Sequence, residues 1–290
     1  MPINLNPTNY FGLSVSEFIE NALREDVGDG DHTSLSTIPE GLVGKANVKV
    51  KEKGVIAGIE LAELIVKTVD PTIQQSIVLK EGTDVNPGDI VMTLDGNVRS
   101  LLKLERLLLN CMQRMSGIAT MTRKYVEAIE GTNCKVLDTR KTTPNFRLLE
   151  KLAVELGGGV NHRFGLYDMI LIKDNHVDAA GGVKNAIESA NRYLKNSGKI
   201  LKIEIETRNL NEVKEVLVIG NVNRIMLDNF TPDLLKEAIT LIAKKYETEA
   251  SGGITLETIR SFALTGVDFI SVGALTHSYR SLDISMKILS

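Results

Sequence analysis

The chain has 290 residues, 43% of them hydrophobic, and a formal net charge of −3 at neutral pH. This length is sufficient for one large domain or two smaller ones, each with a buried core. The basic residues are scattered and tryptophan is absent, which argues against a nucleic acid as partner. No run approaches the roughly 18 apolar residues of a membrane span, which argues against a membrane as partner.

The amino-terminal third predicts a small α+β domain. Its first residues contain neither the basic stretch nor the apolar core of a signal peptide, so we expect a cytoplasmic protein. Residues 14–26 carry apolar side chains at helical spacing, and Ser14 with Glu17 three positions later predicts a capping box. Residues 41–98 then alternate strand-like runs with glycine turns, which indicates a mostly antiparallel sheet.

Residues 99–130 form a strongly apolar helical pattern. We expect this helix to be buried by the rest of the chain or by a partner subunit, and Gly117 to break or bend it between two domains. Arg106 lies among its leucines and needs an anionic partner, because an unpaired buried charge costs several kcal/mol. The residues alone leave a carboxylate of the same subunit and a bound anion equally open. Cys111 and Cys134 lack CxxC spacing, which predicts reduced, buried thiols.

From residue 135 the chain repeats one phrase, a short β-branched run followed by a helical pattern. Strands spaced by helices of this length form parallel β/α units, and the carboxyl ends of such strands meet at one mouth. Only six runs are clear, so we expect an incomplete, open β/α barrel. The six runs are Lys135–Lys141, Asp168–Asn175, Leu201–Thr207, Arg224–Asn229, Glu247–Gly253 and Asp268–Ala274.

Capping residues mark several helix starts in this region. Thr143 and Thr231 each precede a proline, which predicts an N-cap hydroxyl ahead of a proline at the first helical position. Asn209 with Glu212 approximates a capping box, and Thr255 is expected to cap the helix that follows it. These signals support the β/α interpretation independently of the strands.

Cations are concentrated at two of the predicted strand ends. Arg140 and Lys141 follow the first run, and Lys173 ends the second. His162 and Arg163 lie on a glycine-flanked loop between the two runs. Arginine can hold a carboxylate or phosphate with two parallel hydrogen bonds, and lysine acts as a mobile point charge. Cations facing one mouth would repel one another without a bound anion, so we expect an anionic substrate there. Alone, His162 would predict no more than a structural histidine.

Carboxylates follow on the next two strands. Glu204 and Glu206 alternate along one face of the third run, and Asp228 ends the fourth. Glu206 and Asp228, both near strand ends, predict a Mg²⁺ site, with contact directly or through water, because Mg²⁺ shares its coordination with substrate phosphates. Zinc is disfavoured, since no HExxH or paired CxxC motif occurs. Glu204 is left open between a structural partner of a lysine and a functional group.

Two glycine turns close the series. Ser251–Gly253 and Val272–Ala274 follow the last two strands, and backbone amides in the final β/α loops of a barrel often bind phosphate. His277 and Asp283 come after the last strand and are expected to fix a C-terminal helix.

Together these motifs resemble the quinolinate phosphoribosyltransferases, the carboxylating nicotinate-nucleotide pyrophosphorylases. The resemblance extends over nearly the whole chain, and agreement at this many separated motifs is highly specific. The matching stretches are EDVGDGDHTS, ERLLLNCMQRMSGIAT, LDTRKTTPNFRLLEKLAVELGGGVNHRFGLYDMILIKDNH, IEIET, IMLDN, EASGGI and SVGALTHS.

The resemblance implies an α/β protein with an incomplete, open β/α barrel and an N-terminal α+β sandwich domain. We expect the sandwich at residues 1–115, the barrel at residues 116–275 and a C-terminal helix at residues 276–290 that returns to the sandwich. It also implies a homodimer in which each site borrows Arg106 from the partner, with assembly of dimers into a higher oligomer left open.

The implied activity is transfer of the phosphoribosyl group from phosphoribosyl pyrophosphate to quinolinate with decarboxylation, which gives nicotinate mononucleotide, pyrophosphate and CO₂. Lys141, Lys173, Glu206 and Asp228 are the implied catalytic residues, with Mg²⁺ as cofactor. The two carboxylates of quinolinate are assigned to Arg106, Arg140, His162, Arg163 and Lys173. Lys141 is shared between the two substrates, and Thr139 lies beside it. The ribose hydroxyls and the Mg²⁺-bound pyrophosphate are assigned to Glu206 and Asp228, and the 5′-phosphate to Ser251, Gly252, Gly253, Val272, Gly273 and Ala274.

Two other functions stay open from the residues alone. A lysine at a strand end, Lys173 or Lys141, could form a Schiff base as in barrel aldolases, although that chemistry requires a lysine of lowered pKa. The chain could instead be a non-enzymatic sensor that binds the same metabolites. Borohydride trapping tests the first alternative, and turnover by the purified protein tests the second.

Overall fold

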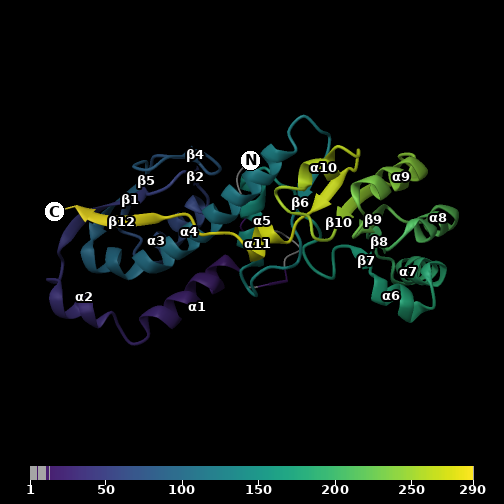
Figure 1. Ribbon diagram of the computed structural model, residues 1–290. Helices are drawn as coiled ribbons and strands as arrows, with labels where there is room; N and C mark the ends of the chain where they lie inside the picture. The colour runs from purple at the N-terminus through teal and green to yellow at the C-terminus, as the bar shows by residue number, and fades with distance from the viewer. Residues whose placement is uncertain (1–4, 6–10, 13, 290) are drawn as a thin grey trace. The chain divides into compact units, whose positions relative to one another are not determined.

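The computed structural model describes residue 5, residues 11–12 and residues 14–289. The chain divides into two compact units (Figure 1). Unit 1 consists of Met1–Arg123, Thr142–Gly158 and Ser278–Ser290, and unit 2 consists of Lys124–Lys141 and Gly159–His277. The domain boundaries predicted from the sequence stay a prediction.

Unit 1 is built on an antiparallel sheet with the strand order β12-β1-β5-β3. Ala46, Val48 and Val50 alternate along β1 and are fully buried, so one face of the sheet lies on the core. The elements of this unit are α1 (Val15–Val27), α2 (His32–Thr37), β1 (Val43–Val50), β2 (Gly54–Val55), α3 (Ile59–Val69), β3 (Gln74–Ile77), β4 (Asp84–Val85), β5 (Ile90–Asn97), most of α4 (Val98–Ala128), α5 (Arg147–Leu156) and β12 (Ile284–Leu289).

The C-terminal helix predicted for residues 276–290 is wrong. A short helix, α11 (Ala274–His277), is followed by the strand β12, which pairs antiparallel with β1 from Lys45↔Leu289 to Val50↔Ile284. The sequence ISMKIL alternates with period 2, and Ile284 and Met286 are its buried residues. This segment therefore completes the sheet of unit 1 (Figure 1).

Gly117 does not break the long helix as predicted, because α4 is continuous from Val98 to Ala128. A Cβ atom at Gly117 would overlap the carbonyl oxygen of Arg280, and it would lie 2.9 Å from the Cα atom of Ser281. Glycine is therefore used here for close packing of the C-terminal segment against the helix. Within the described residues no helix is long and apolar enough to cross a membrane.

The predicted helix caps are confirmed in part. Ser14 and Glu17 form the capping box of α1, and Thr231 accepts a hydrogen bond from the backbone of α9. Asn209 caps α8 and accepts the backbone N–H of Glu212 at 3.0 Å. The Thr143 prediction is wrong, since α5 begins at Arg147 after a turn in which the N–H of Phe146 donates to the carbonyl of Thr143.

Unit 2 contains the open β/α barrel that the sequence predicts. All six expected strands are present, and they form one parallel sheet with the order β6-β11-β10-β9-β8-β7. The outer strands β6 and β7 do not pair with each other in the described part of the chain. The elements of this unit are β6 (Lys135–Leu137), β7 (Ile170–Ile172), α6 (Asp174–Ala180), α7 (Val183–Ser197), β8 (Ile203–Thr207), α8 (Leu210–Ile219), β9 (Arg224–Asp228), α9 (Pro232–Ile242), β10 (Glu247–Ser251), α10 (Ile259–Ala263), β11 (Phe269–Ser271) and α11.

Both cysteines are free and buried, as predicted. Burial raises the pKa of the Cys111 thiol and of the Cys134 thiol to about 12. The two groups are therefore protonated at neutral pH and are poor nucleophiles.

Candidate functional site

A cavity of about 860 Å³ opens where the strands of unit 2 end. Residues at or just past the carboxyl ends of β6, β7, β8, β9, β10 and β11 contribute to its wall, as the β/α topology requires. The predicted site residues that line it are Thr139, Arg140, Lys141, His162, Arg163, Lys173, Glu206, Asp228, Ser251, Gly252, Gly253, Val272, Gly273 and Ala274.

Arg106 is the predicted site residue that does not line this cavity. It belongs to unit 1, on α4, and its side chain is exposed within the described chain. The expectation that Arg106 is buried, and so needs an anionic partner, is therefore wrong within the described chain. Its neighbours Leu107, Leu108 and Leu109 on the same helix are buried, so the arginine itself is the exposed position of this stretch.

One wall of the cavity is cationic. Arg140 and Lys141 follow β6, and Lys173 follows β7 as the N-cap of α6. Burial and the nearby Arg140 guanidinium lower the pKa of Arg163. A bound anion would offset both the burial of the Arg163 charge and its repulsion by Arg140.

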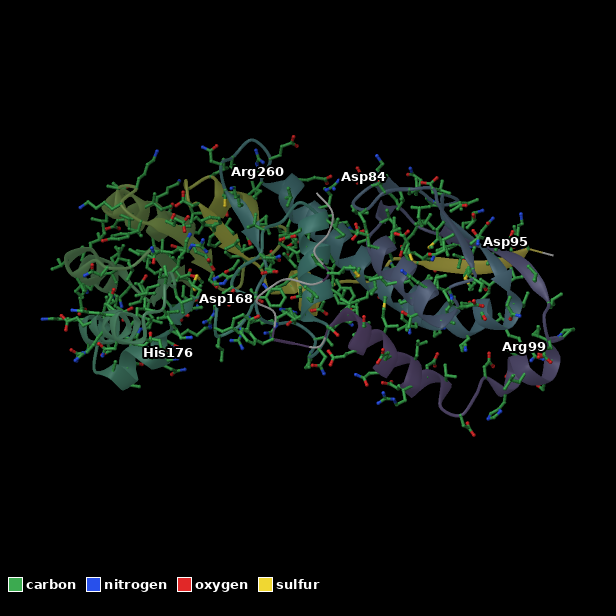
Figure 2. All side chains as sticks on the ribbon, turned by 180° about the vertical axis from the view of Figure 1, so that it is seen from behind. Asp84, Asp95, Arg99, Asp168, His176 and Arg260 are labelled. Carbon is green, nitrogen blue, oxygen red and sulfur yellow. The ribbon has the colours of Figure 1, made fainter. Side chains whose placement is uncertain are left out.

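The loop that carries Arg163 is held by two carboxylates. Asp138, which is fully buried after β6, accepts the backbone N–H of His162 at 2.8 Å. The exposed Asp168 in Figure 2 accepts the backbone N–H groups of Phe164 at 2.6 Å and Gly165 at 2.8 Å. The backbone on both sides of Arg163 is therefore fixed before any ligand arrives.

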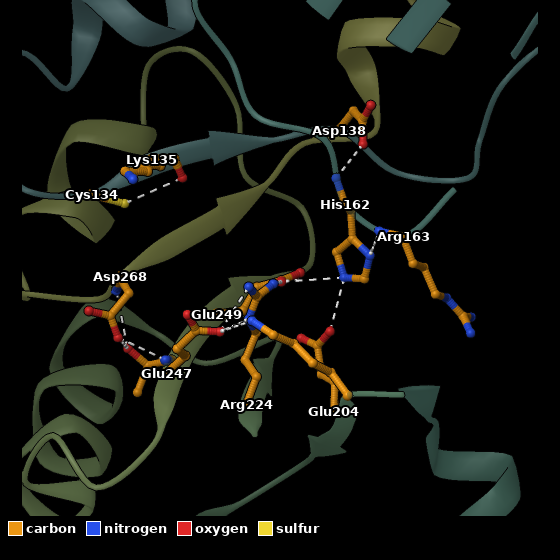
Figure 3. Close-up of polar contacts among 12 residues, drawn as sticks. Cys134, Lys135, Asp138, His162, Arg163, Glu204, Arg224, Glu247, Glu249 and Asp268 are labelled. Atoms are coloured by element: carbon orange, nitrogen blue, oxygen red, sulfur yellow. Dashed lines mark hydrogen bonds and ion pairs between the residues drawn. The ribbon is translucent and has the colours of Figure 1, made fainter. Parts of the chain in front are cut away.

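His162 is held by a buried charged network (Figure 3). Its Nε2 atom lies 3.1 Å from an oxygen of Glu204 and 3.4 Å from an oxygen of Glu249, and Arg224 donates to the same Glu249 oxygen at 3.0 Å. The Nδ1 atom accepts the backbone N–H of Arg163 at 2.6 Å. Burial opposes a charge on His162, but its bonds to the two glutamates prevail and raise its pKa to about 9.

Glu204, for which the sequence left open a structural pairing with a lysine or a functional role, therefore pairs with a histidine. Burial and the neighbouring Glu249 raise the pKa of Glu204 to about 7. His162, Glu204 and Glu249 also bring three potential metal-ligand atoms within 4.8 Å of one another. Because Arg224 already pairs with Glu249 and the His162 ring already lies against both carboxylates, we interpret this cluster as a structural network and not as a metal centre.

Glu206 and Asp228 form the acidic wall of the cavity. Burial and the Asp228 carboxylate raise the pKa of Glu206, and burial raises the pKa of Asp228 against the effect of Lys173. Two carboxylates that disfavour each other's charge, in a cavity open to a ligand, suit a divalent cation. The donor set therefore fits the predicted metal.

The two glycine turns face the same cavity. Gly252 and Gly253 have φ values of +98° and +60°, which side chains other than glycine rarely adopt. A Cβ atom at Gly273 would lie 3.0 Å from the Cδ atom of Lys141, so the glycine lets that lysine approach the turn. Thr276 donates from its hydroxyl to the carbonyl of Lys141 at 2.9 Å, which fixes the same contact.

The Thr255 cap is a further correction. The helix α10 begins at Ile259, and its N-cap is Thr258, whose side chain makes no capping bond. Thr255 instead donates its backbone N–H to the hydroxyl of Thr258 at 3.0 Å, within a turn at the edge of the cavity.

Sequence reasoning missed several residues of this region. Asp174, Asn229, Glu249 and His277 all line the cavity, and none of them was expected there. Glu249 could have been found from the alternation Glu247, Glu249 and Ser251 along β10, which repeats the alternation recognised in β8. His277 was expected to fix a C-terminal helix, but it ends the short helix α11 and the segment that follows forms the strand β12.

Comparison with known families gives two matches that cover most of the chain. The description "Quinolinate phosphoribosyl transferase, N-terminal domain" matches residues 31–116, and "Quinolinate phosphoribosyl transferase, C-terminal domain" matches residues 118–287.

The names of similar proteins agree with these matches. The chain is 44% identical to the chloroplastic nicotinate-nucleotide pyrophosphorylase [carboxylating] of Arabidopsis thaliana, over 99% of this chain and 86% of the relative. It is 41% identical to the probable nicotinate-nucleotide pyrophosphorylase [carboxylating] of Bacillus subtilis, over 95% and 94%. Among solved structures, NadC from Streptococcus pyogenes superposes with a TM-score of 0.90 at 41% identity, over 95% of this chain and 97% of that chain.

Proposed function

Because this chain belongs to the quinolinate phosphoribosyl transferase family, we propose that the cavity of unit 2 is where its reaction takes place. The enzyme makes nicotinate mononucleotide from quinolinate and phosphoribosyl pyrophosphate in NAD biosynthesis. One observation carries the proposal: a single cavity has a cationic wall, an acidic wall and two glycine turns. These three features match a dicarboxylate, a metal-bound pyrophosphate and a phosphate ester.

The cationic wall is proposed to bind quinolinate. Arg140, Arg163 and Lys173 would pair with its two carboxylates, and Lys141 would lie between the two substrates, next to Thr139. For His162, a direct hydrogen bond to a carboxylate is disfavoured, because both ring nitrogens already lie against protein partners. We propose that this histidine acts by holding the Arg163 backbone in place.

The acidic wall and the turns are proposed to bind phosphoribosyl pyrophosphate. Enzymes of this family usually use a divalent metal. We propose that this metal is Mg²⁺ and that Glu206 and Asp228 hold it, directly or through water, together with the ribose hydroxyls. The backbone amides of residues 251–253 and 272–274 would bind the 5′-phosphate.

The reaction follows from this arrangement of charge. The bond between C1′ and the pyrophosphate oxygen breaks while the quinolinate nitrogen bonds to C1′, and Lys141 would offset the charge that grows on the leaving group. The bound metal would add Lewis-acid stabilisation of the same charge. The new pyridinium ring then accepts the electron pair of the adjacent carboxylate bond, CO₂ leaves, and the ring carbon takes up a proton.

None of these steps needs a covalent nucleophile. Positioning of the two substrates supplies much of the rate, since effective molarity in well-oriented pairs can be worth about 7–11 kcal/mol. The proposed catalytic residues are accordingly Lys141, Lys173, Glu206 and Asp228, which bind and orient the reacting groups.

The oligomeric state belongs to the proposal as well. The exposed Arg106 on α4 would reach the quinolinate bound in a partner subunit, which makes the functional unit a homodimer. Association of such dimers into a larger oligomer, and a cytoplasmic location, stay predictions.

Substrate discrimination tests the cationic wall. Nicotinic acid lacks one of the two carboxylates, so Arg140, Arg163 and Lys173 would be left partly unpaired when it binds. Sites built for a charged group reject an analogue without it by roughly 10⁴-fold. We expect formation of nicotinate mononucleotide from quinolinate and a kcat/KM lower by about that factor for nicotinic acid. Comparable values for the two substrates would refute the assignment.

A further inference from the structure

Asn229 lies at the end of β9, directly after Asp228, and it lines the cavity. Its φ value of 57° places it in the left-handed region. Its backbone N–H donates to the carbonyl of Ser251 at 2.8 Å and so extends the pairing of β9 with β10. The residue is thus held at the point where the acidic wall meets the first glycine turn.

The side chain of Asn229 touches both features. Its Nδ2 atom donates to the Oδ2 atom of Asp228 at 2.5 Å. Its Oδ1 atom lies so close to Gly252 that a Cβ atom at that glycine would overlap it. Gly252 is therefore required to be glycine by this contact as well as by its φ value of +98°.

We infer that Asn229 is a positioning residue for phosphoribosyl pyrophosphate, which orients the Asp228 carboxylate with one end of its amide and fixes the Gly252 turn with the other. The inference rests on the proposed function of the cavity. It adds that the Asp228 carboxylate, which contacts the pyrophosphate end of the substrate, and the Gly252 turn, which contacts the 5′-phosphate end, are connected through the Asn229 side chain.

The chemistry of position 229 favours asparagine over the two residues that share its backbone tolerance. Asparagine, aspartate and glycine accept a left-handed conformation with little strain. Aspartate would place a second carboxylate against Asp228, and glycine would offer no donor. Asparagine alone among the three combines the backbone conformation with a hydrogen bond to a carboxylate.

The experiment compares Asn229→Gly with the wild type and with Asn221→Gly. Asn221 is a matched control, because it has a φ value of 59° and does not line the cavity. Calorimetry measures three probes separately: magnesium pyrophosphate, ribose 5-phosphate without metal, and quinolinate. Steady-state kinetics give KM and kcat, and thermal unfolding confirms that each variant is folded.

Loss of a hydrogen bond to a charged group predicts about tenfold weaker binding of magnesium pyrophosphate to Asn229→Gly. Ribose 5-phosphate should also bind more weakly, the KM for phosphoribosyl pyrophosphate should rise, and quinolinate affinity should stay unchanged. Asn229→Asp should bind magnesium pyrophosphate no better than Asn229→Gly does. Asn221→Gly should match the wild type with all three probes.

Wild-type binding of both phosphate probes by Asn229→Gly would overturn the inference, as would an equal loss of quinolinate affinity. Weakening of only one phosphate probe would overturn the joint role. Asp228→Ala separates this inference from the function it rests on. If Asp228→Ala keeps its affinity for magnesium pyrophosphate, the proposed acidic wall is wrong. If Asp228→Ala loses that affinity while Asn229→Gly binds magnesium pyrophosphate as the wild type does, only the inference about Asn229 is refuted.

Discussion

The buried pair of His162 and Glu249 makes a quantitative prediction about stability and pH. Burial opposes the charged imidazole, yet the bonds to Glu204 and Glu249 raise the pKa of His162 from 6.5 to about 9. A group with a raised folded-state pKa stabilises the protein fully below its unfolded pKa, and this stabilisation is lost as the pH rises through the folded pKa. The window of loss therefore runs from about pH 6.5 to about pH 9.

The size of the effect follows from the two pKa values. Their difference of about 2.5 corresponds to about 3.4 kcal/mol at 1.36 kcal/mol for each factor of ten. Because protonation of His162 is coupled to folding, roughly 2 kcal/mol of this stabilisation is lost between pH 7 and pH 9.5. Glu249→Gln removes one of the two charges that hold the imidazolium, so the loss in this variant should fall to roughly 1 kcal/mol.

Glu247→Gln is the matched control. Glu247 shares Arg224 with Glu249 at 3.1 Å but is not one of the two glutamates that pair with His162, so its removal should leave the pH dependence unchanged. The free energy of unfolding of all three proteins is measured by denaturant titration at pH 7 and pH 9.5. Labelled histidine, with only four such residues in the chain, gives the pKa directly by NMR.

Equal destabilisation of Glu249→Gln at both pH values would refute the reasoning, as would a His162 pKa near 6.5 in the wild type. If Glu247→Gln reduces the pH dependence of the unfolding free energy as much as Glu249→Gln does, the effect must instead be attributed to Arg224, which both glutamates contact.

Other outcomes are expected from the site and the packing. Glu206→Ala should weaken magnesium-dependent binding of phosphoribosyl pyrophosphate in calorimetry and leave quinolinate affinity intact. An equal loss of both affinities would show that the metal is assigned to the wrong residues. Arg106→Ala and Lys141→Ala should each abolish activity without unfolding the protein, and mixing them under verified subunit exchange should restore part of it. No recovery would refute the shared site. Gly117→Ala should destabilise the protein by about 1–3 kcal/mol in denaturant titration, because the new Cβ atom would overlap the Arg280 carbonyl. On an exposed helix the same substitution would stabilise the protein by about 1 kcal/mol, since alanine has the higher helix propensity. A stabilised variant would contradict the packing described for this glycine.

The cavity was largely predictable from the sequence, because its residues follow a local rule. Lys141, Lys173 and Asp228 each lie just past a β-branched run, and parallel β/α topology brings such positions together whatever the details of packing. The alternation in β8 likewise separates Glu204 from its neighbours on the opposite face of the strand, and that alternation is a property of the residue order alone.

What failed depends on contacts between distant segments. The partner of Glu204 is His162, which lies 42 positions earlier, and no periodic pattern encodes such a pair. Gly117 suggested a break in the helix only because its partner, the Arg280 carbonyl, belongs to a remote part of the chain. Asn229 was missed since its importance comes from a left-handed backbone and a neighbour on another strand, neither of which its residue type reveals.

The pairing of β12 with β1 has a consequence for folding during synthesis. The last strand of the unit 1 sheet leaves the ribosome more than 230 residues after its partner, whereas every strand of the barrel lies between Lys135 and Ser271. Long-range pairing of this kind is slow because the intervening chain must be closed into a loop. The barrel can therefore assemble while β1 still has one open edge, and an open edge is a site for mispairing with another chain. A nascent or truncated chain that lacks residues 284–289 should consequently depend on chaperones in a way that the finished protein does not.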